Sequence, residues 1–100
     1  MSSPKYQLYI TARAASDHDA ILQYTLEKWG EAQANYYGAM LTKTMDAVCN
    51  NPLSSQAKPE ISNDTRVILA GSHVIVYRVC GSSVYISRIL HARMDIKQHI

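Results

Sequence analysis

Three residues in the second half of the chain have side chains suited to binding or proton transfer: Arg78, Tyr85 and His91. An arginine can clamp a phosphate or carboxylate, a tyrosine can stack on a planar group, and a histidine can titrate near neutral pH. If these side chains share one face of a sheet, they form a shallow basic platform. The same residue types are common on a solvated strand face, and the pattern alone favours that structural interpretation.

Other sequence signatures of chemistry are absent from the 100 residues. There is no glycine-rich phosphate loop, no nucleophile elbow, no Cys and His spacing typical of zinc, and no pair of carboxylates at a shared site. Cys49 and Cys80 are too few for a disulfide framework, so we expect reduced thiols in a reducing cytoplasm. The sequence therefore predicts neither a metal nor a cofactor.

Length and charge indicate one globular domain, which we place at residues 1–100. The net charge of +2 is too small by itself to indicate a nucleic-acid binder, but it is unevenly distributed. Residues 1–50 hold four basic and five acidic side chains, whereas residues 51–100 hold six basic and three acidic ones. Without the apolar run of a signal peptide or a membrane span, we expect a cytoplasmic protein that does not associate with membranes.

The first half of the chain is predicted to form a strand and two helices. Residues 5–11 alternate apolar and polar side chains, which is typical of a strand with one wet face. A helix is predicted to begin at Ser16, as its cap, and to end at Gly30. A second helix begins at Glu31 and ends at Asn50-Asn51-Pro52, where asparagine can adopt a left-handed cap. One glycine between two amphipathic helices predicts an antiparallel helical hairpin.

The second half is predicted to be a loop followed by three strands. Residues 53–64 lack periodicity, and β-branched runs then cover residues 66–70, 73–79 and 84–90. Sequential antiparallel strands form a meander, and residues 93–100 form either a last helical turn or a frayed tail. The order strand, helix, helix, strand, strand, strand predicts an α+β fold, a two-layer sandwich with the helical hairpin on one face of a mainly antiparallel sheet.

The predicted turn at Gly81-Ser82 assigns side chains to the two faces of the sheet. If the loop is symmetric, Val79 lies opposite Val84, and the face packed on the helices carries residues 75, 77, 79, 84, 86, 88 and 90. The other face then carries Arg78, Tyr85 and His91, together with residues 74, 76, 87 and 89. An odd-length loop would exchange these sets. Arg88 on the packed face needs a carboxylate, either Asp95 or an acidic residue of the helices.

Aromatic residues concentrate in the predicted helices. Trp29, at the corner between them, is expected to fill the base of the core rather than bind a partner. Tyr36 and Tyr37 are adjacent on one helix and cannot both face inward, so one of them is expected to be exposed and suited to an interface. His18 is expected at the boundary of the core, and His73 has no interpretable context.

Short segments in a fixed order carry a family pattern. The more specific ones are the strand Tyr77-Arg78-Val79 and the ending Leu90-His91-Ala92-Arg93-Met94-Asp95. Weaker ones are Tyr24-Thr25, Trp29-Gly30-Glu31 with Gln33, Asn51-Pro52, Gly71-Ser72-His73-Val74-Ile75-Val76, and Arg88-Ile89. Together they resemble the ParE branch of the RelE/ParE toxin superfamily over nearly the whole chain. The chain departs from the pattern at Ser72, where an arginine often stands, and in the loop 53–64, which lacks a typical glycine-arginine element.

The resemblance implies the toxin of a type II toxin–antitoxin pair, neutralised by a ParD-like antitoxin with which it forms a hetero-oligomer. ParE-type toxins poison DNA gyrase by binding, with no catalytic residue, and the target or its bound DNA would be met by Arg66, Arg78, His91 and Arg93. The antitoxin's apolar segment would lie across the helical hairpin and the neighbouring sheet edge, acidic where it meets the basic half of the chain. The predicted antitoxin-binding residues are Tyr24, Tyr36, Tyr37, Met40 and Arg78.

An alternative is a RelE-like endoribonuclease that cuts messenger RNA on the ribosome. That chemistry needs a base, an acid and cations over a developing phosphorane, which Arg66, Arg78, Tyr85 and His91 could supply. Only five lysines and arginines follow residue 65, which is sparse for this activity. A third possibility is a degenerate toxin that is retained only as an assembly partner.

Overall fold

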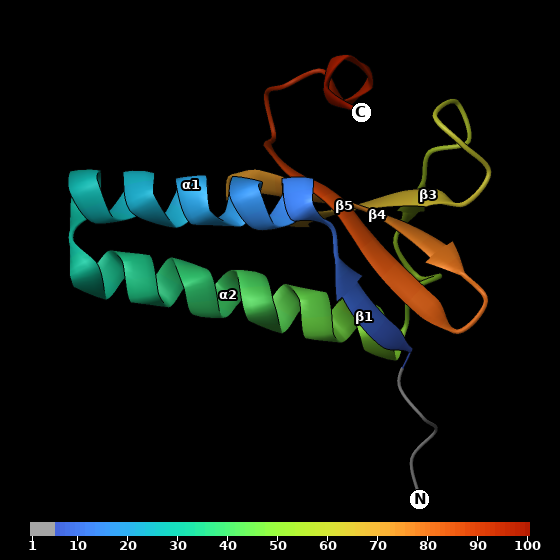
Figure 1. Ribbon diagram of the computed structural model, residues 1–100, viewed down its shortest axis with the longest axis horizontal. Coiled ribbons are helices and arrows are strands. Elements are labelled where there is room, and N and C mark those ends of the chain that lie inside the picture. The colour runs from blue at the N-terminus through green and yellow to red at the C-terminus, as the bar shows by residue number, and fades with distance from the viewer. Residues whose placement is uncertain (1–5) are drawn as a thin grey trace, which may run out of the picture.

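The computed structural model describes residues 6–100 (Figure 1). The elements are, in chain order, β1 (Gln7–Ile10), α1 (Ala12–Trp29), α2 (Glu31–Asn50), β2 (Gln56–Ala57), β3 (Thr65–Ala70), β4 (His73–Cys80), β5 (Ser83–His91) and the 3₁₀-helix η1 (Ile96–His99). The predicted α+β order is confirmed, and Lys5, placed in the predicted first strand, lies outside the described residues.

The strands form one mixed sheet in the order β1-β5-β4-β3-β2. β1 is parallel to β5, whereas the other neighbouring strands are antiparallel. α1 and α2 run side by side, and the end of the hairpin at Gly30 projects beyond the sheet (Figure 1). The strand β2 lies within the segment predicted to be a loop, where two residues are too few to give a periodic signal.

The first helix begins earlier than predicted, because Thr11 and not Ser16 caps it. The Thr11 hydroxyl accepts a hydrogen bond from the Ala14 N–H at 3.1 Å, and Ser16 lies inside the helix. Gly30 ends α1 as predicted, with a φ of 94°, and α2 begins at the next residue. α2 ends at Asn50 as predicted, but Asn51 has a φ of −153° and a ψ of 71°, so the expected left-handed cap is wrong.

The register of β4 and β5 corrects part of the face assignment. The two-residue turn at Gly81-Ser82 pairs Val79 with Val84 as predicted, but Tyr77 pairs with Ile86 and Val76 pairs with Arg88. Ser87 is therefore an extra residue, a β-bulge. Every later side chain of β5 changes face: Ile89 and His91 point to the helices, and Leu90 points away from them. Periodicity cannot reveal such a bulge, because the composition of the strand stays the same.

Two apolar clusters stabilise the sheet. The larger one joins α1, α2 and the sheet, and its fully buried side chains include Leu41, Ile75, Tyr77 and Ile86. The smaller one, on the opposite face, consists of Val67, Val76 and Leu90 with Val74 and Ile96 packed against it. The C-terminal segment is thus a 3₁₀ turn on the outer face. None of the helices among residues 6–100 has the length and hydrophobicity needed to span a membrane.

Candidate functional site

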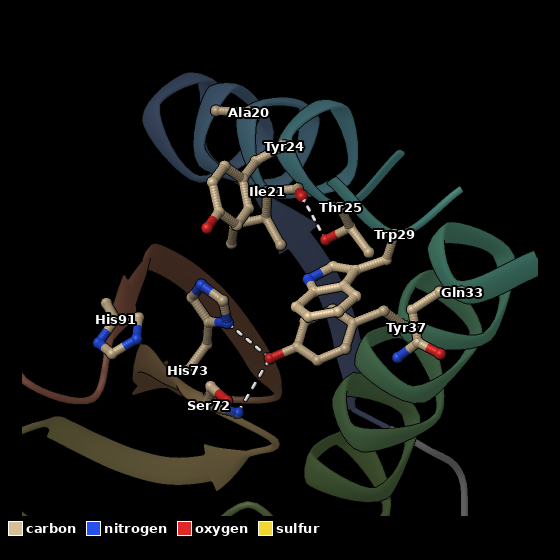
Figure 2. Close-up of a pocket in the computed structure, with 10 residues that line it drawn as sticks. All are labelled: Ala20, Ile21, Tyr24, Thr25, Trp29, Gln33, Tyr37, Ser72, His73 and His91. Atoms are coloured by element: carbon tan, nitrogen blue, oxygen red, sulfur yellow. Dashed lines mark hydrogen bonds between the residues drawn. The ribbon is translucent and has the colours of Figure 1, made fainter. Parts of the chain in front are cut away.

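A groove of about 460 Å³ lies where the helical hairpin meets one end of the sheet (Figure 2). α1 forms one wall, α2 contributes two side chains, and the β3–β4 turn and the end of β5 complete it. The lining residues are Ala20, Ile21, Tyr24, Thr25, Trp29, Gln33, Tyr37, Ser72, His73 and His91. Its volume lies in the range typical of ligand pockets, and its walls are mainly aromatic and apolar.

Tyr37 of α2 connects the helical layer to the β3–β4 turn. Its hydroxyl accepts a hydrogen bond from the Ser72 N–H at 3.0 Å and lies 2.6 Å from the Nδ1 of His73 (Figure 2). Gly71, with a φ of 61°, allows this approach, since a Cβ there would lie 2.8 Å from the Tyr37 hydroxyl oxygen. The turn therefore has a fixed position relative to α2, and His73 is held at the floor of the groove.

His73 and His91 are cross-strand partners at the end of the sheet. Their ring centroids are 5.4 Å apart with planes at 74°, and the main-chain N–H of Arg93 donates to the Nδ1 of His91 at 3.2 Å. Burial lowers the pKa of His73, and the neighbouring His91 lowers it further. Sequence reasoning missed His73, although its position opposite His91 follows once the bulge is known.

The α1 wall presents exposed aromatic rings. Trp29 is 65% exposed and Tyr24 is 59% exposed, so the expectation that Trp29 fills the base of the core is wrong. The hairpin projects past the sheet at this point, which leaves no core for the indole to enter. The Lys28 ammonium lies 5.8 Å from the Tyr24 ring centroid and 5.9 Å from that of Trp29, within reach of both aromatic faces.

Arg78 and Tyr85 lie on the opposite face of the sheet, away from the groove. Tyr85 stacks on Tyr9 with centroids 5.1 Å apart, and Arg78 donates to Asp64 at 2.9 Å. Hydrogen bonds from Arg78 and then Ser62 hold the pKa of the Asp64 carboxyl well below its usual range. The positive charge of Arg78 is therefore already matched by a carboxylate.

The Arg66 guanidinium is hydrogen-bonded to main-chain carbonyls of the segment that follows α2. It donates to the carbonyl oxygens of Leu53 at 3.0 Å and Ser55 at 2.6 Å, which fastens the segment after α2. Arg66 pairs across the strands with Tyr77, whose hydroxyl donates to the Pro52 carbonyl at 2.7 Å. Arg66 thus lies on the helix side of the sheet, and Arg78 lies on the other side.

Arg88 pairs with Val76, so the predicted position on the packed face is wrong, but Arg88 finds its carboxylate on α1, which was one of the two predicted options. Its Nε and Nη2 donate to Asp17 at 2.8 and 3.0 Å, and the Ile89 N–H donates to the same carboxylate at 2.9 Å. Another Arg88 nitrogen donates to the carbonyl of His99. Burial raises the pKa of Asp17, but the hydrogen bonds from Arg88 and Ile89 outweigh it, and the net pKa is lowered. The Asp17–Arg88 pair therefore connects α1 to β5, and Arg88 connects β5 to the 3₁₀-helix η1.

The predicted site residues fall into separate groups. The predicted outward position of His91 beside Arg78 and Tyr85 is wrong, because the Ser87 bulge turns His91 into the groove.

Of the predicted antitoxin-binding residues, Tyr24 and Tyr37 line the groove and Met40 packs beneath Gly71. Tyr36, 69% exposed, lies outside the groove, and Arg78 lies on the far face. Among residues 6–100, no group of three His, Cys, Asp or Glu side chains is placed to hold a metal.

Comparison with known proteins agrees with this architecture. Residues 8–96 match the family described as the ParE toxin of the type II toxin–antitoxin system parDE. The chain is 35% identical over 94 residues to "Toxin ParE1" of Mycobacterium tuberculosis, covering 92% of this chain and 96% of that protein. It is 34% identical over 91 residues to "Toxin ParE1" of Caulobacter vibrioides, covering 91% and 94%.

Two solved structures share the fold. A chain of the chromosomal ParDE system of P. aeruginosa superposes with a TM-score of 0.75 at 21% identity, covering 89% of this chain and 98% of that one. A chain of the RelBE2 toxin–antitoxin complex of Mycobacterium tuberculosis gives 0.62 at 18% identity, covering 90% and 94%. The family match over residues 8–96 and the identity with the two ParE1 toxins show that the chain belongs to the ParE toxin family of type II toxin–antitoxin systems.

Proposed function

We propose that this toxin is neutralised by a ParD-like antitoxin whose apolar segment occupies the groove between the helical hairpin and the β3–β4 turn. The observation that carries the proposal is the pair of exposed rings, Tyr24 and Trp29, on one wall of a groove whose floor is fixed by Tyr37. Exposed aromatic side chains beside a formed pocket are typical of binding hot spots. The membership of the chain in a toxin–antitoxin family supports a protein occupant.

The groove also specifies the character of the occupant. Its walls offer apolar and aromatic surface, and its floor offers the imidazole rings of two histidines. A segment that presents one or two large apolar side chains in helical or extended form would bury them against α1. The Lys28 ammonium beside the Tyr24 and Trp29 rings, together with the two imidazoles of the floor, favours an acidic group on that segment.

The toxic activity proposed is the poisoning of DNA gyrase by binding, in the cytoplasm and without catalysis. The arrangement of the residues that RNA cleavage would need supports this choice. Arg78 is paired with Asp64, Arg66 binds main-chain carbonyls, and His91 faces the groove on the other side of the sheet from Tyr85. General acid–base cleavage requires the acid, the base and the cations within hydrogen-bond reach of one phosphate.

The test is a supercoiling assay with purified toxin. Relaxed plasmid, ATP and gyrase are incubated with increasing toxin, with and without the ParD-like antitoxin encoded beside it, and the products are separated by electrophoresis. We expect loss of supercoiling and accumulation of cleaved DNA, both reversed by the antitoxin. Normal supercoiling at excess toxin that still arrests growth when expressed would contradict the gyrase proposal.

The endoribonuclease alternative has its own signature. If the toxin is expressed alone and messenger RNA is cut at defined sites, with cutting abolished by His91→Ala, the activity is that of an enzyme. Unimpaired growth with soluble, folded toxin in the cell would instead indicate a degenerate toxin that only assembles with its partner.

A further inference from the structure

The two imidazoles of the groove have their inner nitrogens occupied by the protein itself. The Nδ1 of His73 lies 2.6 Å from the Tyr37 hydroxyl, and the Nδ1 of His91 receives the Arg93 N–H at 3.2 Å. In Figure 2 the second ring nitrogen of His73 is turned away from Tyr37. The Nε2 atoms are therefore the ring positions left for a ligand.

The hydrogen bonds also allow the ring protons to be assigned. The Arg93 N–H can only donate, so the neutral His91 ring carries its proton on Nε2. The Tyr37 hydroxyl already accepts from the Ser72 N–H and directs its own proton to its nearest acceptor, the His73 Nδ1. Because this contact is shorter than the 3.4 Å contact with the Ala70 carbonyl, we assign the proton of the neutral His73 ring to Nε2 as well. The neutral pair offers two N–H donors and no acceptor to an occupant of the groove.

Among the described side chains that line the groove and the cavity next to it, the one carboxylate is already paired. α1 contributes the hydroxyl of Tyr24 and, in an adjoining cavity of about 190 Å³, Asp17, which is held by Arg88 of β5. α2 contributes the hydroxyl of Tyr37, and η1 contributes His99 to the adjoining cavity. The Lys28 ammonium lies over the rings of the α1 wall. A proton on either imidazole thus has no counter-charge until a ligand brings one.

We infer that a carboxylate of the antitoxin segment lies against His73 and His91 and that the pair takes up a proton on binding, so antitoxin capture strengthens as the solution becomes more acidic. This inference rests on the proposed role of the groove. A carboxylate beside an imidazole favours its charged form, and a ligand that raises proton affinity binds more tightly where protons are available. In the free toxin burial lowers the pKa of His73, so this ring is one that can gain a proton when a carboxylate comes to lie beside it.

Protonation is compatible with the hydrogen bonds on the floor. When His73 gains a proton on Nδ1, the ring becomes the donor to the Tyr37 hydroxyl, and that hydroxyl can turn its own proton to the Ala70 carbonyl, 3.4 Å away. The turn thus retains its attachment to α2 in both charge states. A main-chain carbonyl of the antitoxin would use the same Nε2–H donors with no proton uptake, and the experiment separates these two occupants.

The experiment is calorimetric titration of the intact toxin with the full-length ParD-like antitoxin encoded beside it. Titrations run from about pH 8 to about pH 5 in buffers of different ionisation enthalpy, which gives the number of protons taken up and covers the range in which the free imidazole titrates. A shift of one pKa unit corresponds to a tenfold change, so we expect Kd to tighten by about tenfold with net proton uptake. Tight binding that is independent of pH and of buffer would overturn the inference and leave the proposed function standing. Absence of binding at every pH would contradict the proposed function itself.

Variants locate the effect. His73→Asn keeps a side-chain acceptor near Tyr37 but cannot titrate, and His91→Gln removes the other imidazole. The readout is the slope of log Kd against pH, which should flatten in the double variant. His18→Gln is the matched control, since His18 lies in a separate pocket of about 250 Å³ beside β1, and it should keep the slope. An unchanged slope in the folded double variant would also overturn the inference. An antitoxin variant with the contacting carboxylate changed to its amide should reproduce the flat slope.

Discussion

The hydroxyl of Tyr37 lies 2.6 Å from the Nδ1 of His73 and also accepts the Ser72 N–H at 3.0 Å, so one side chain of α2 fixes both the turn and the imidazole behind it. Tyr37→Phe leaves the Ser72 N–H and the His73 ring without this partner. We expect the free energy of unfolding to fall by about 1–2 kcal/mol. Urea denaturation measures it, with Tyr36→Phe as the control because Tyr36 is exposed. Equal values for the two variants would contradict the role assigned to the Tyr37 hydroxyl.

Gly71 and Gly81 form a matched pair of turn glycines. Both have positive φ, 61° and 58°, so alanine at either position costs about 1–2 kcal/mol of backbone strain. A Cβ at Gly71 would also lie 2.8 Å from the Tyr37 hydroxyl oxygen and the Met40 Cε, whereas Gly81 has no heavy atom within 4 Å. We therefore expect Gly71→Ala to destabilise the protein by about 1–3 kcal/mol more than Gly81→Ala in urea denaturation. Equal losses would mean that the turn yields to the added methyl group.

The Asp17 carboxylate is expected to contribute to acid stability. Asp17→Asn weakens the hydrogen bonds to Arg88 and should cost about 2–3 kcal/mol, since a partly buried charged partner is lost. The native pKa of Asp17 is lowered, so its contribution is present above 3.8 and is lost as the pH falls through the lower folded value.

Thermal unfolding from about pH 6 to about pH 2 measures this contribution. The variant should lose stability less steeply below pH 3.8 than the native protein does. Asp19→Asn is the control, because Asp19 is exposed and lies 4.0 Å from His18, its one ion-pair partner among the described residues. Parallel acid curves for the native protein and Asp17→Asn would rule out the proposed linkage.

Cys80 should react slowly despite its exposure. Its thiol donates to Asp64 at 3.4 Å, and this hydrogen bond raises the pKa of the thiol. Because the thiolate is the nucleophile, alkylation by iodoacetamide near pH 8 should be several-fold slower than for a small free thiol. Asp64→Asn should accelerate it, whereas Asp95→Asn should not; peptide mapping by mass spectrometry follows Cys80 separately from Cys49. A rate that is unaffected by Asp64→Asn would refute the assigned hydrogen bond.

Trp29 should matter for binding rather than for folding. At 65% exposure, its replacement in Trp29→Ala should change the free energy of unfolding by less than about 1 kcal/mol. The Kd for the ParD-like antitoxin should rise by about 30-fold or more, as for other aromatic hot spots. Leu26→Ala removes another exposed side chain of α1 outside the groove and should leave Kd near the native value. A core role for Trp29 would instead appear as a large loss of stability.

The element order and most of the core were predictable from the sequence, because periodicity of apolar residues and glycine or proline breaks are local signals. The helical hairpin around Gly30, the meander and the turn at Gly81-Ser82 follow from such signals. The beginning of α1 was not found, because Ser16 and Asp17 have good capping chemistry in sequence. In the fold the Asp17 carboxylate instead accepts hydrogen bonds from Arg88, 71 residues away.

The tertiary structure alone decided the groove. The Ser87 bulge moved His91 from the platform of Arg78 to the side of His73, and a bulge leaves no periodic trace in a short strand. The projection of the hairpin past the sheet exposed Trp29, which composition would bury. By itself the sequence determined which elements form and which family the chain resembles, since those depend on local pattern. Which side chains meet depends on register and on the relative position of the layers, and these are properties of the packed chain.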